Sequence, residues 1–132
     1  MHWITQFLGQ QWHPTEYNCW SFVADVYNTM LDLSLIISEP IDAGNKIGVA
    51  REIRIAASCG DWIEMEIPDE FNVVLMGRSS TGTHVGVWTN SDGGRIVHCN
   101  EGQGVGSMTL KRAQDLGYKL IKFYRYADYS RN

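Results

Sequence analysis

Residues 83–99 read THVGVWTNSDGGRIVHC, and this stretch decides the fold. The segments 83–89 and 95–99 are short and rich in β-branched residues, which is typical of β-strands. Between them, residues 90–94 (NSDGG) form a strong turn signal, because asparagine and glycine accept the backbone angles that tight turns require. We therefore predict a β-hairpin over this stretch.

The register of the hairpin decides which side chains share a face of the sheet. We expect Thr89 to pair with Arg95 across the turn. Gly86 then lies opposite His98 on the neighbouring strand. Because His84 shares the face of Gly86, the two histidines become diagonal neighbours about 7–8 Å apart, within side-chain reach. A register one pair tighter places them directly opposite, whereas an odd shift separates them onto different faces.

A helix is predicted upstream of the hairpin. Asn18 is a favourable N-cap, since its side-chain oxygen can accept a free backbone N–H, and residues 19–31 place polar residues at helical spacing. The remaining expected elements are helical segments at 2–8 and 41–57 and strands at 71–76 and 120–125. Helices first and antiparallel strands afterwards give an α+β layout.

Length and charge limit the function classes. The chain has 132 residues, so we expect a single domain over 1–132. A formal net charge of -4 provides no basic surface and argues against nucleic-acid binding. No apolar run is long enough to span a membrane, and residues 1–6 lack the features of a signal peptide. We therefore expect a protein made in the cytoplasm, with no membrane span.

The three cysteines are Cys19, Cys59 and Cys99, an odd number without a CxxC pair. This pattern predicts neither a disulfide framework nor a tetrahedral zinc site. We expect Cys59 and Cys99 to be structural, with Cys99 pointing into the core. Cys19 begins a helix, where free N–H groups and the positive end of the dipole favour a thiolate. On position alone, a nucleophilic and a structural role for Cys19 are about equally open.

Strand periodicity adds a base and an orienting group to this candidate nucleophile. Gly86 lets another backbone approach the face of His84 closely, and we expect the helix that begins at Cys19 to do so. Cys19 would then attack, His84 would take and return the proton, and His98 would orient the His84 ring. The N–H of Cys19 is a candidate oxyanion donor. An alternative is a zinc site formed by the cysteine and both histidines, with Glu101 as general base.

The same motifs, in order, resemble the NlpC/P60 family of cysteine peptidases, in the branch found in phage tail-tip and prophage proteins. Residues 18–27 (NCWSFVADVY) resemble the nucleophile helix of that family, and residues 84–88 (HVGVW) resemble the strand with its catalytic histidine. Weaker similarities are found at 71–76 (FNVVLM), 96–99 (IVHC) and 123–126 (FYRY). The resemblance runs from about Phe7 to Tyr126.

The resemblance implies a papain-like α+β core, with N-terminal helices packed on a central antiparallel sheet. It implies a catalytic triad of Cys19, His84 and His98, with no metal or cofactor. Trp12 stands where many members have a tyrosine whose hydroxyl aids the oxyanion, so Trp12 becomes a candidate oxyanion or substrate-binding residue. Asn18 departs from the usual aspartate.

The implied activity is thiol-dependent hydrolysis of amide bonds in bacterial peptidoglycan stem peptides, often the γ-D-glutamyl–diaminopimelate bond. The implied partners are the stem peptide and phage tail-tip proteins, with the chain acting in a virion tail at the cell wall. The alternatives are a CHAP-type N-acetylmuramoyl-L-alanine amidase, a non-catalytic tail assembly subunit and a toxin against competing bacteria. An active Cys19 is expected to alkylate at mildly acidic pH, faster than Cys59 or Cys99.

Overall fold

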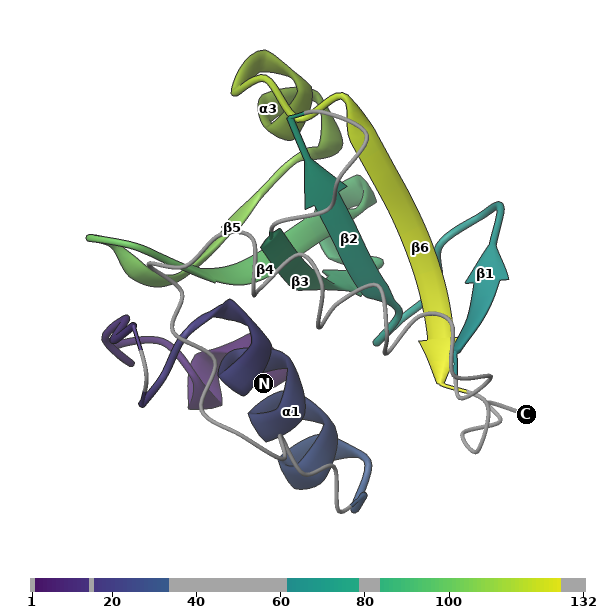
Figure 1. Cartoon of the computed structure of the whole chain (residues 1–132). Helices are drawn as coiled ribbons and strands as arrows, with labels where there is room; N and C mark the ends of the chain where they lie inside the picture. The colour runs from purple at the N-terminus through teal and green to yellow at the C-terminus, as the bar shows by residue number, and fades with distance from the viewer. Residues whose placement is uncertain (1, 15, 34–61, 79–83, 127–132) are drawn as a thin grey trace.

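The structure is a computed structural model that describes residues 2–14, 16–33, 62–78 and 84–126 (Figure 1). Within these ranges the fold is α+β, with one sheet whose strand order is β1-β6-β2-β3-β4-β5. All five neighbouring pairs are antiparallel. The strands are β1 (Trp62–Met65), β2 (Val73–Gly77), β3 (His84–Thr89), β4 (Arg95–Asn100), β5 (Gly104–Met108) and β6 (Leu120–Tyr126). The helices are η1 (Trp3–Gln6), α1 (Cys19–Met30), η2 (Ser91–Gly93) and α3 (Leu110–Asp115).

Helix α1 begins where the sequence predicts. Asn18 has an extended backbone, and its Oδ1 accepts hydrogen bonds from the N–H groups of Trp20 and Ser21, each at 3.1 Å. These bonds satisfy two of the N–H groups that a helix start leaves without a partner. The helix therefore starts at Cys19, as expected.

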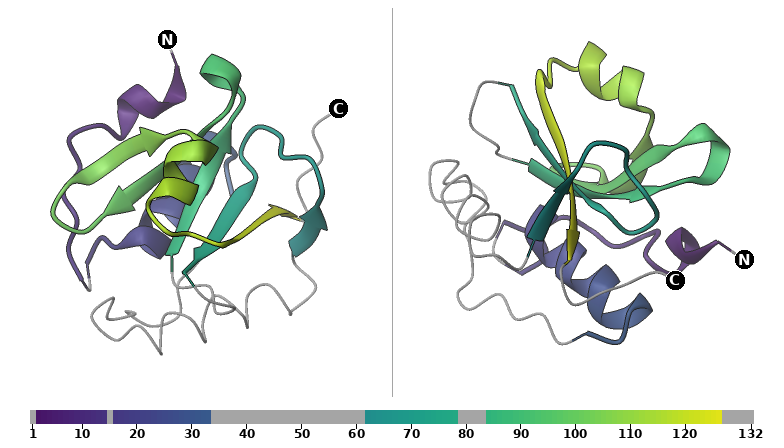
Figure 2. Two further views of the ribbon diagram at one scale, coloured as in Figure 1. Left: turned by 90° about the horizontal axis from the view of Figure 1, so that it is seen from above. Right: turned by 90° about the vertical axis from the view of Figure 1, so that its right-hand side faces the viewer.

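Side chains alternate between the two faces of the sheet along each strand, so each face carries its own apolar cluster. The face toward α1 carries Val73 and Leu75 of β2, Val85 and Val87 of β3, and Val97 and Cys99 of β4. The opposite face carries Val74, Met76, Trp88, Ile96 and Met108, which pack with Ala113 of α3. The right-hand view of Figure 2 shows the two helices on opposite sides of the sheet. The expected inward orientation of Cys99 is confirmed.

The β3–β4 register is the expected one, since Thr89 pairs with Arg95 and Val87 with Val97. If this register continues by one pair, Gly86 lies opposite His98. In agreement, a β-carbon on Gly86 would lie 3.2 Å from Cβ of His98. The same β-carbon would lie only 2.7 Å from the carbonyl oxygen of Val97. The neighbouring strand therefore crowds Gly86. The expectation that α1 approaches this face is wrong, because α1 packs on the other face of the sheet.

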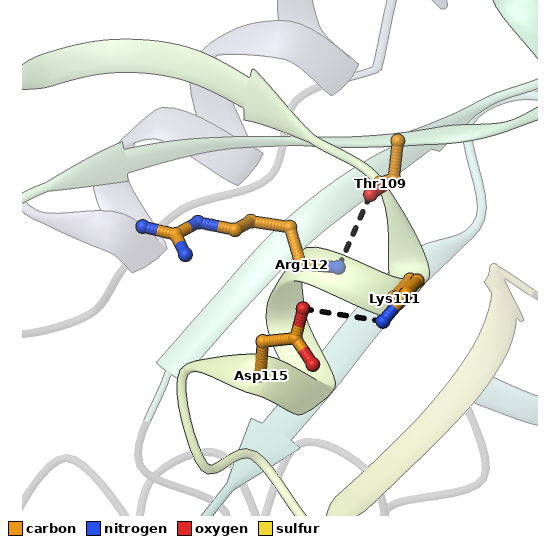
Figure 3. Close-up of polar contacts among 4 residues, drawn as sticks. All are labelled: Thr109, Lys111, Arg112 and Asp115. Atoms are coloured by element: carbon orange, nitrogen blue, oxygen red, sulfur yellow. Dashed lines mark hydrogen bonds and ion pairs between the residues drawn. The ribbon is translucent and has the colours of Figure 1, made fainter.

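Three elements lie outside the sequence-based expectations: strands β1 and β5 and helix α3. Helix α3 is capped by Thr109, whose Oγ1 accepts from the N–H of Arg112 at 3.1 Å (Figure 3). Lys111 and Asp115 form an exposed ion pair at 3.5 Å on the same helix.

The helical segment expected at 2–8 is a short 3₁₀-helix, η1, and the segment expected at 41–57 lies outside the described residues. Across the ranges that the structure describes, no helix is both long and apolar enough to cross a bilayer.

Candidate active site

Cys19 is the first residue of α1 and is 4 % exposed. Three backbone N–H groups face its sulfur, those of Cys19, Trp20 and Val85. The N–H of Val85 belongs to the peptide that joins His84 to Val85. The fold therefore places the sulfur against the first peptide of β3, directly beside the backbone of the predicted base.

His84 and His98 meet as the hairpin register predicts. Nε2 of His84 lies 2.8 Å from Nδ1 of His98, and the two rings are nearly perpendicular at 80°. His84 is the first residue of β3, and His98 lies near the middle of β4. The structure thus brings the predicted base and its predicted orienting residue into hydrogen-bond contact.

The thiol and the His84 ring approach the same peptide from two sides of the sheet. The Val85 side chain lies in the cluster on the α1 side, together with Cys19. The His84 ring instead stacks on Tyr118, which belongs to the cluster on the α3 side. Among the described residues, the Cys19 sulfur forms no hydrogen bond with the His84 ring. The nucleophile and base are therefore neighbours whose proton-transfer contact is not formed.

Burial sets the protonation state of the cysteines. Burial raises the pKa of the Cys19 thiol, although the N–H groups of Val85, Trp20 and Cys19 lower it. The N–H groups at the helix start favour the thiolate, as expected, but burial outweighs them and the resting group is a neutral thiol. The pKa of Cys99 is also raised, to about 11, by burial and by the nearby Cys19. Its S–H points at the carbonyl of Tyr17 at 3.8 Å, which fits a structural role.

Both histidines are neutral near pH 7. Burial, followed by the positive charges of His98 and Arg78, lowers the pKa of His84 to about 3. Burial lowers the pKa of His98 to about 4. A neutral pair shares a single proton across the Nε2–Nδ1 contact. When His84 Nε2 carries that proton, its Nδ1 is free to accept one from a thiol.

Trp12 is half-buried and packs against the cluster that contains Cys19. Its loop is tied to strand β5, because the N–H of Val105 donates to the carbonyl of Gln10 at 3.2 Å. The predicted oxyanion residue is thus on the same side of the sheet as the thiol. The N–H groups of Cys19 and Trp20, which already face the sulfur, are closer candidates for that role.

Two residues at the site carry no signal in the sequence. Tyr118, in the turn between α3 and β6, stacks on His84 with ring centroids 6.1 Å apart and planes 16° apart. The guanidinium carbon of Arg78, which follows β2, lies 4.5 Å from the centroid of the Tyr118 ring. Neither belongs to a motif, and only the packing of α3 brings them to the histidine pair.

The described residues contain no group of three His, Cys, Asp or Glu side chains placed to hold a metal ion. The alternative zinc site formed by Cys19, His84 and His98 therefore does not exist in this arrangement.

A cavity of about 510 Å³ lies at the other end of the hairpin, where Thr89 and Arg95 contribute to its lining. It is separate from Cys19. The third cysteine, Cys59, lies outside the described residues.

Comparison of the chain with protein-family models, with curated proteins and with solved structures found no match. Its function must therefore be argued from the motifs and from the geometry of this site.

Proposed function

We propose that this chain is a thiol hydrolase of the NlpC/P60 type, with a papain-like core, that cleaves amide bonds in peptidoglycan stem peptides. One observation carries the proposal. The sulfur of Cys19 lies against the His84–Val85 peptide, while His84 is held by His98 at 2.8 Å. A cysteine at a helix start, a neutral histidine and an orienting group are the parts that a thiol hydrolase needs.

The reaction follows from the protonation states. Nδ1 of His84 takes the thiol proton as the Cys19 sulfur attacks the amide carbon, and the oxyanion is held by the N–H groups of Cys19 and Trp20. His84 then gives the proton to the leaving amine as the C–N bond breaks. Water, deprotonated by the same nitrogen, hydrolyses the thioester and restores the thiol.

The Cys19–His84 contact is not formed in the resting structure, and substrate binding is proposed to form it. The thiol is buried and neutral, and the histidine is neutral. A rotamer change of Cys19 on substrate binding brings the sulfur into proton-transfer distance of the His84 ring, which His98 and Tyr118 hold in place. This arrangement keeps the nucleophile protonated until a substrate arrives.

The substrate class follows from the resemblance of residues 18–27 and 84–88 to NlpC/P60 motifs. On that basis the bond is the γ-D-glutamyl–diaminopimelate amide, and the setting is a phage tail at the cell wall. The CHAP-type amidase would use the same cysteine and histidine on the bond between muramic acid and L-alanine.

Digestion of purified disaccharide–tetrapeptide muropeptides, followed by mass analysis of the products, tests the proposal. An endopeptidase leaves the disaccharide attached to L-alanine and D-glutamate, whereas an amidase releases the free disaccharide from an intact peptide. We expect the first pattern. The second pattern would reassign the bond, and uncleaved muropeptide at high enzyme concentration would overturn the hydrolase.

A non-catalytic subunit that only binds is the second candidate, and one observation favours it. Cys19 is buried and has a raised pKa, and its contact with the His84 ring is not formed. Such a subunit would sediment with purified sacculi and release no product. Binding would be the same for wild type and Cys19→Ala.

A further inference from the structure

The turn between α3 and β6 is fastened to the end of β2. The N–H of Lys119 donates to the carbonyl of Gly77 at 3.0 Å, and Nε of Arg78 donates to the carbonyl of Leu116 at 3.3 Å. Tyr118 lies within this fastened turn and is 8 % exposed. The backbone that carries Tyr118 is therefore held on both sides, by one backbone and one side-chain hydrogen bond.

Tyr118 contacts two different groups with its ring. The Arg78 guanidinium lies over the ring at 4.5 Å from the centroid, a cation–π distance. The imidazole of His84 stacks on the ring at 6.1 Å and 16°, within the range of offset aromatic stacking. The three side chains come from the residue after β2, the α3–β6 turn and the start of β3.

We infer that Tyr118 is a positioning residue for His84 and that Arg78 holds Tyr118 in place. The inference rests on the proposed role of His84 as base. Tyr118 belongs to the cluster on the α3 side and Cys19 to the cluster on the α1 side, so the effect of Tyr118 passes through the imidazole.

The two contacts of His84 constrain different rotations. Stacking on Tyr118 fixes the plane of the imidazole. The 2.8 Å contact from Nε2 to His98 fixes the rotation of the ring within that plane. Together they determine where Nδ1 points, and neither contact does so alone. A base whose nitrogen must meet a thiol proton depends on this direction.

The positive charges around the His84 imidazole favour its neutral form. The groups that face His84 are His98 from β4, Arg78 from the residue after β2 and Tyr118 from the α3–β6 turn. Positive charge on His98 or Arg78 opposes protonation of His84 and helps to lower its pKa. Arg78 thus keeps the imidazole available as an acceptor as well as anchoring its neighbour.

Long-range ¹H–¹⁵N spectra of the histidine rings near pH 7 test this role without requiring activity. The His84 signals are assigned by their loss in His84→Gln. We expect one dominant tautomer in wild type and in Tyr118→Phe, which keeps the ring. In Tyr118→Leu we expect averaged nitrogen shifts, and a fall in kcat of about 10- to 100-fold with KM within about twofold.

An unchanged His84 tautomer in folded Tyr118→Leu, with kcat equal to that of Tyr118→Phe, would overturn the positioning role. If wild type hydrolyses nothing, the proposed function fails, and the tautomer alone still decides the role of Tyr118. If Tyr118→Leu does not fold, Arg78→Met decides, because Arg78 is exposed. We expect His84 to titrate at higher pH in Arg78→Met, with increased tautomer averaging. An unchanged titration and tautomer in that variant would overturn the role of the pair.

Discussion

Nε2 of His84 lies 2.8 Å from Nδ1 of His98, so side chains as well as the backbone join β3 to β4. The contact exists because Thr89 pairs with Arg95 and the register is carried along the hairpin. Both rings are neutral in the folded protein, with pKa values lowered to about 3 and about 4. This neutral pair makes the stability of the fold depend on pH below about 6.5.

The first prediction concerns acid. Because both pKa values are below the ordinary 6.5, the unfolded chain binds more protons than the folded chain between pH 6.5 and about pH 3 to 4. The contribution of the neutral pair is therefore complete above pH 6.5 and is lost as the pH falls through this window. Each unit of pKa depression corresponds to about 1.4 kcal/mol in the free energy of unfolding.

Urea denaturation at pH 7 and at about pH 4.5 measures the effect. The double variant His84→Gln/His98→Gln cannot titrate at these positions and should lose less stability between the two pH values than wild type. Equal losses in the two proteins would contradict the assignment of neutral, buried histidines.

The second prediction uses two glycines that flank His98 on neighbouring strands. A β-carbon on Gly86 would lie 2.7 Å from the carbonyl oxygen of Val97, whereas one on Gly106 would have nothing within 4 Å. Gly106 pairs with His98 on β5. We expect Gly86→Ala to lower the free energy of unfolding by about 1–3 kcal/mol and to disturb the histidine pair. Gly106→Ala is the matched control and should be close to wild type in the same urea titration. Similar stability of the two variants would show that β4 does not crowd Gly86.

The third prediction concerns the start of α1. Asn18 Oδ1 accepts from two backbone N–H groups and from the Ser21 hydroxyl, each at 3.1 Å. Removal of this acceptor in Asn18→Ala should cost about 1 kcal/mol, within a range of about 0.5–2. Asn18→Asp keeps a side-chain oxygen and should lose less. If thermal or urea unfolding ranks Asn18→Asp below Asn18→Ala, the cap is not the main role of this residue.

The hairpin and the cap could be predicted because their causes are local. The turn at residues 90–94 fixes the register, and Asn18 caps the helix that follows it. Strand β5 could not be predicted, because Gly104 and Gly106 interrupt any β-branched pattern. This strand is specified by pairing with β4 and by the bond from Val105 to the carbonyl of Gln10.

In the candidate site, too, one part could be predicted from the sequence and another could not. The pairing of His84 with His98 follows from strand periodicity, and the structure confirms it. The protonation state of Cys19 does not follow from its position. The helix start favours a thiolate, but burial by the sheet outweighs it, and burial is a property of tertiary packing. The contact between Tyr118 and His84 likewise depends on the docking of α3.

The fourth prediction reverses the expected reactivity of Cys19. A thiol that is 4 % exposed and has a raised pKa should react with iodoacetamide at pH 6 at least about 10-fold more slowly than an unfolded peptide carrying the same residues. Cys99, with a pKa of about 11, should be similarly slow. Peptide mapping by mass spectrometry separates the cysteines. Fast alkylation of Cys19 at pH 6 would show that the resting thiol is ionised and accessible.

Cys19 and Cys99 provide the most direct test of the central claim, because both are buried cysteines on the α1 side of the sheet. The measurement is the rate of product release from purified disaccharide–tetrapeptide muropeptide by wild type, Cys19→Ala and Cys99→Ala, each checked for folding by circular dichroism. The account predicts no product above background with folded Cys19→Ala, and a rate within a few-fold of wild type, on the order of threefold, with Cys99→Ala. Product release by Cys19→Ala at the wild-type rate would contradict it.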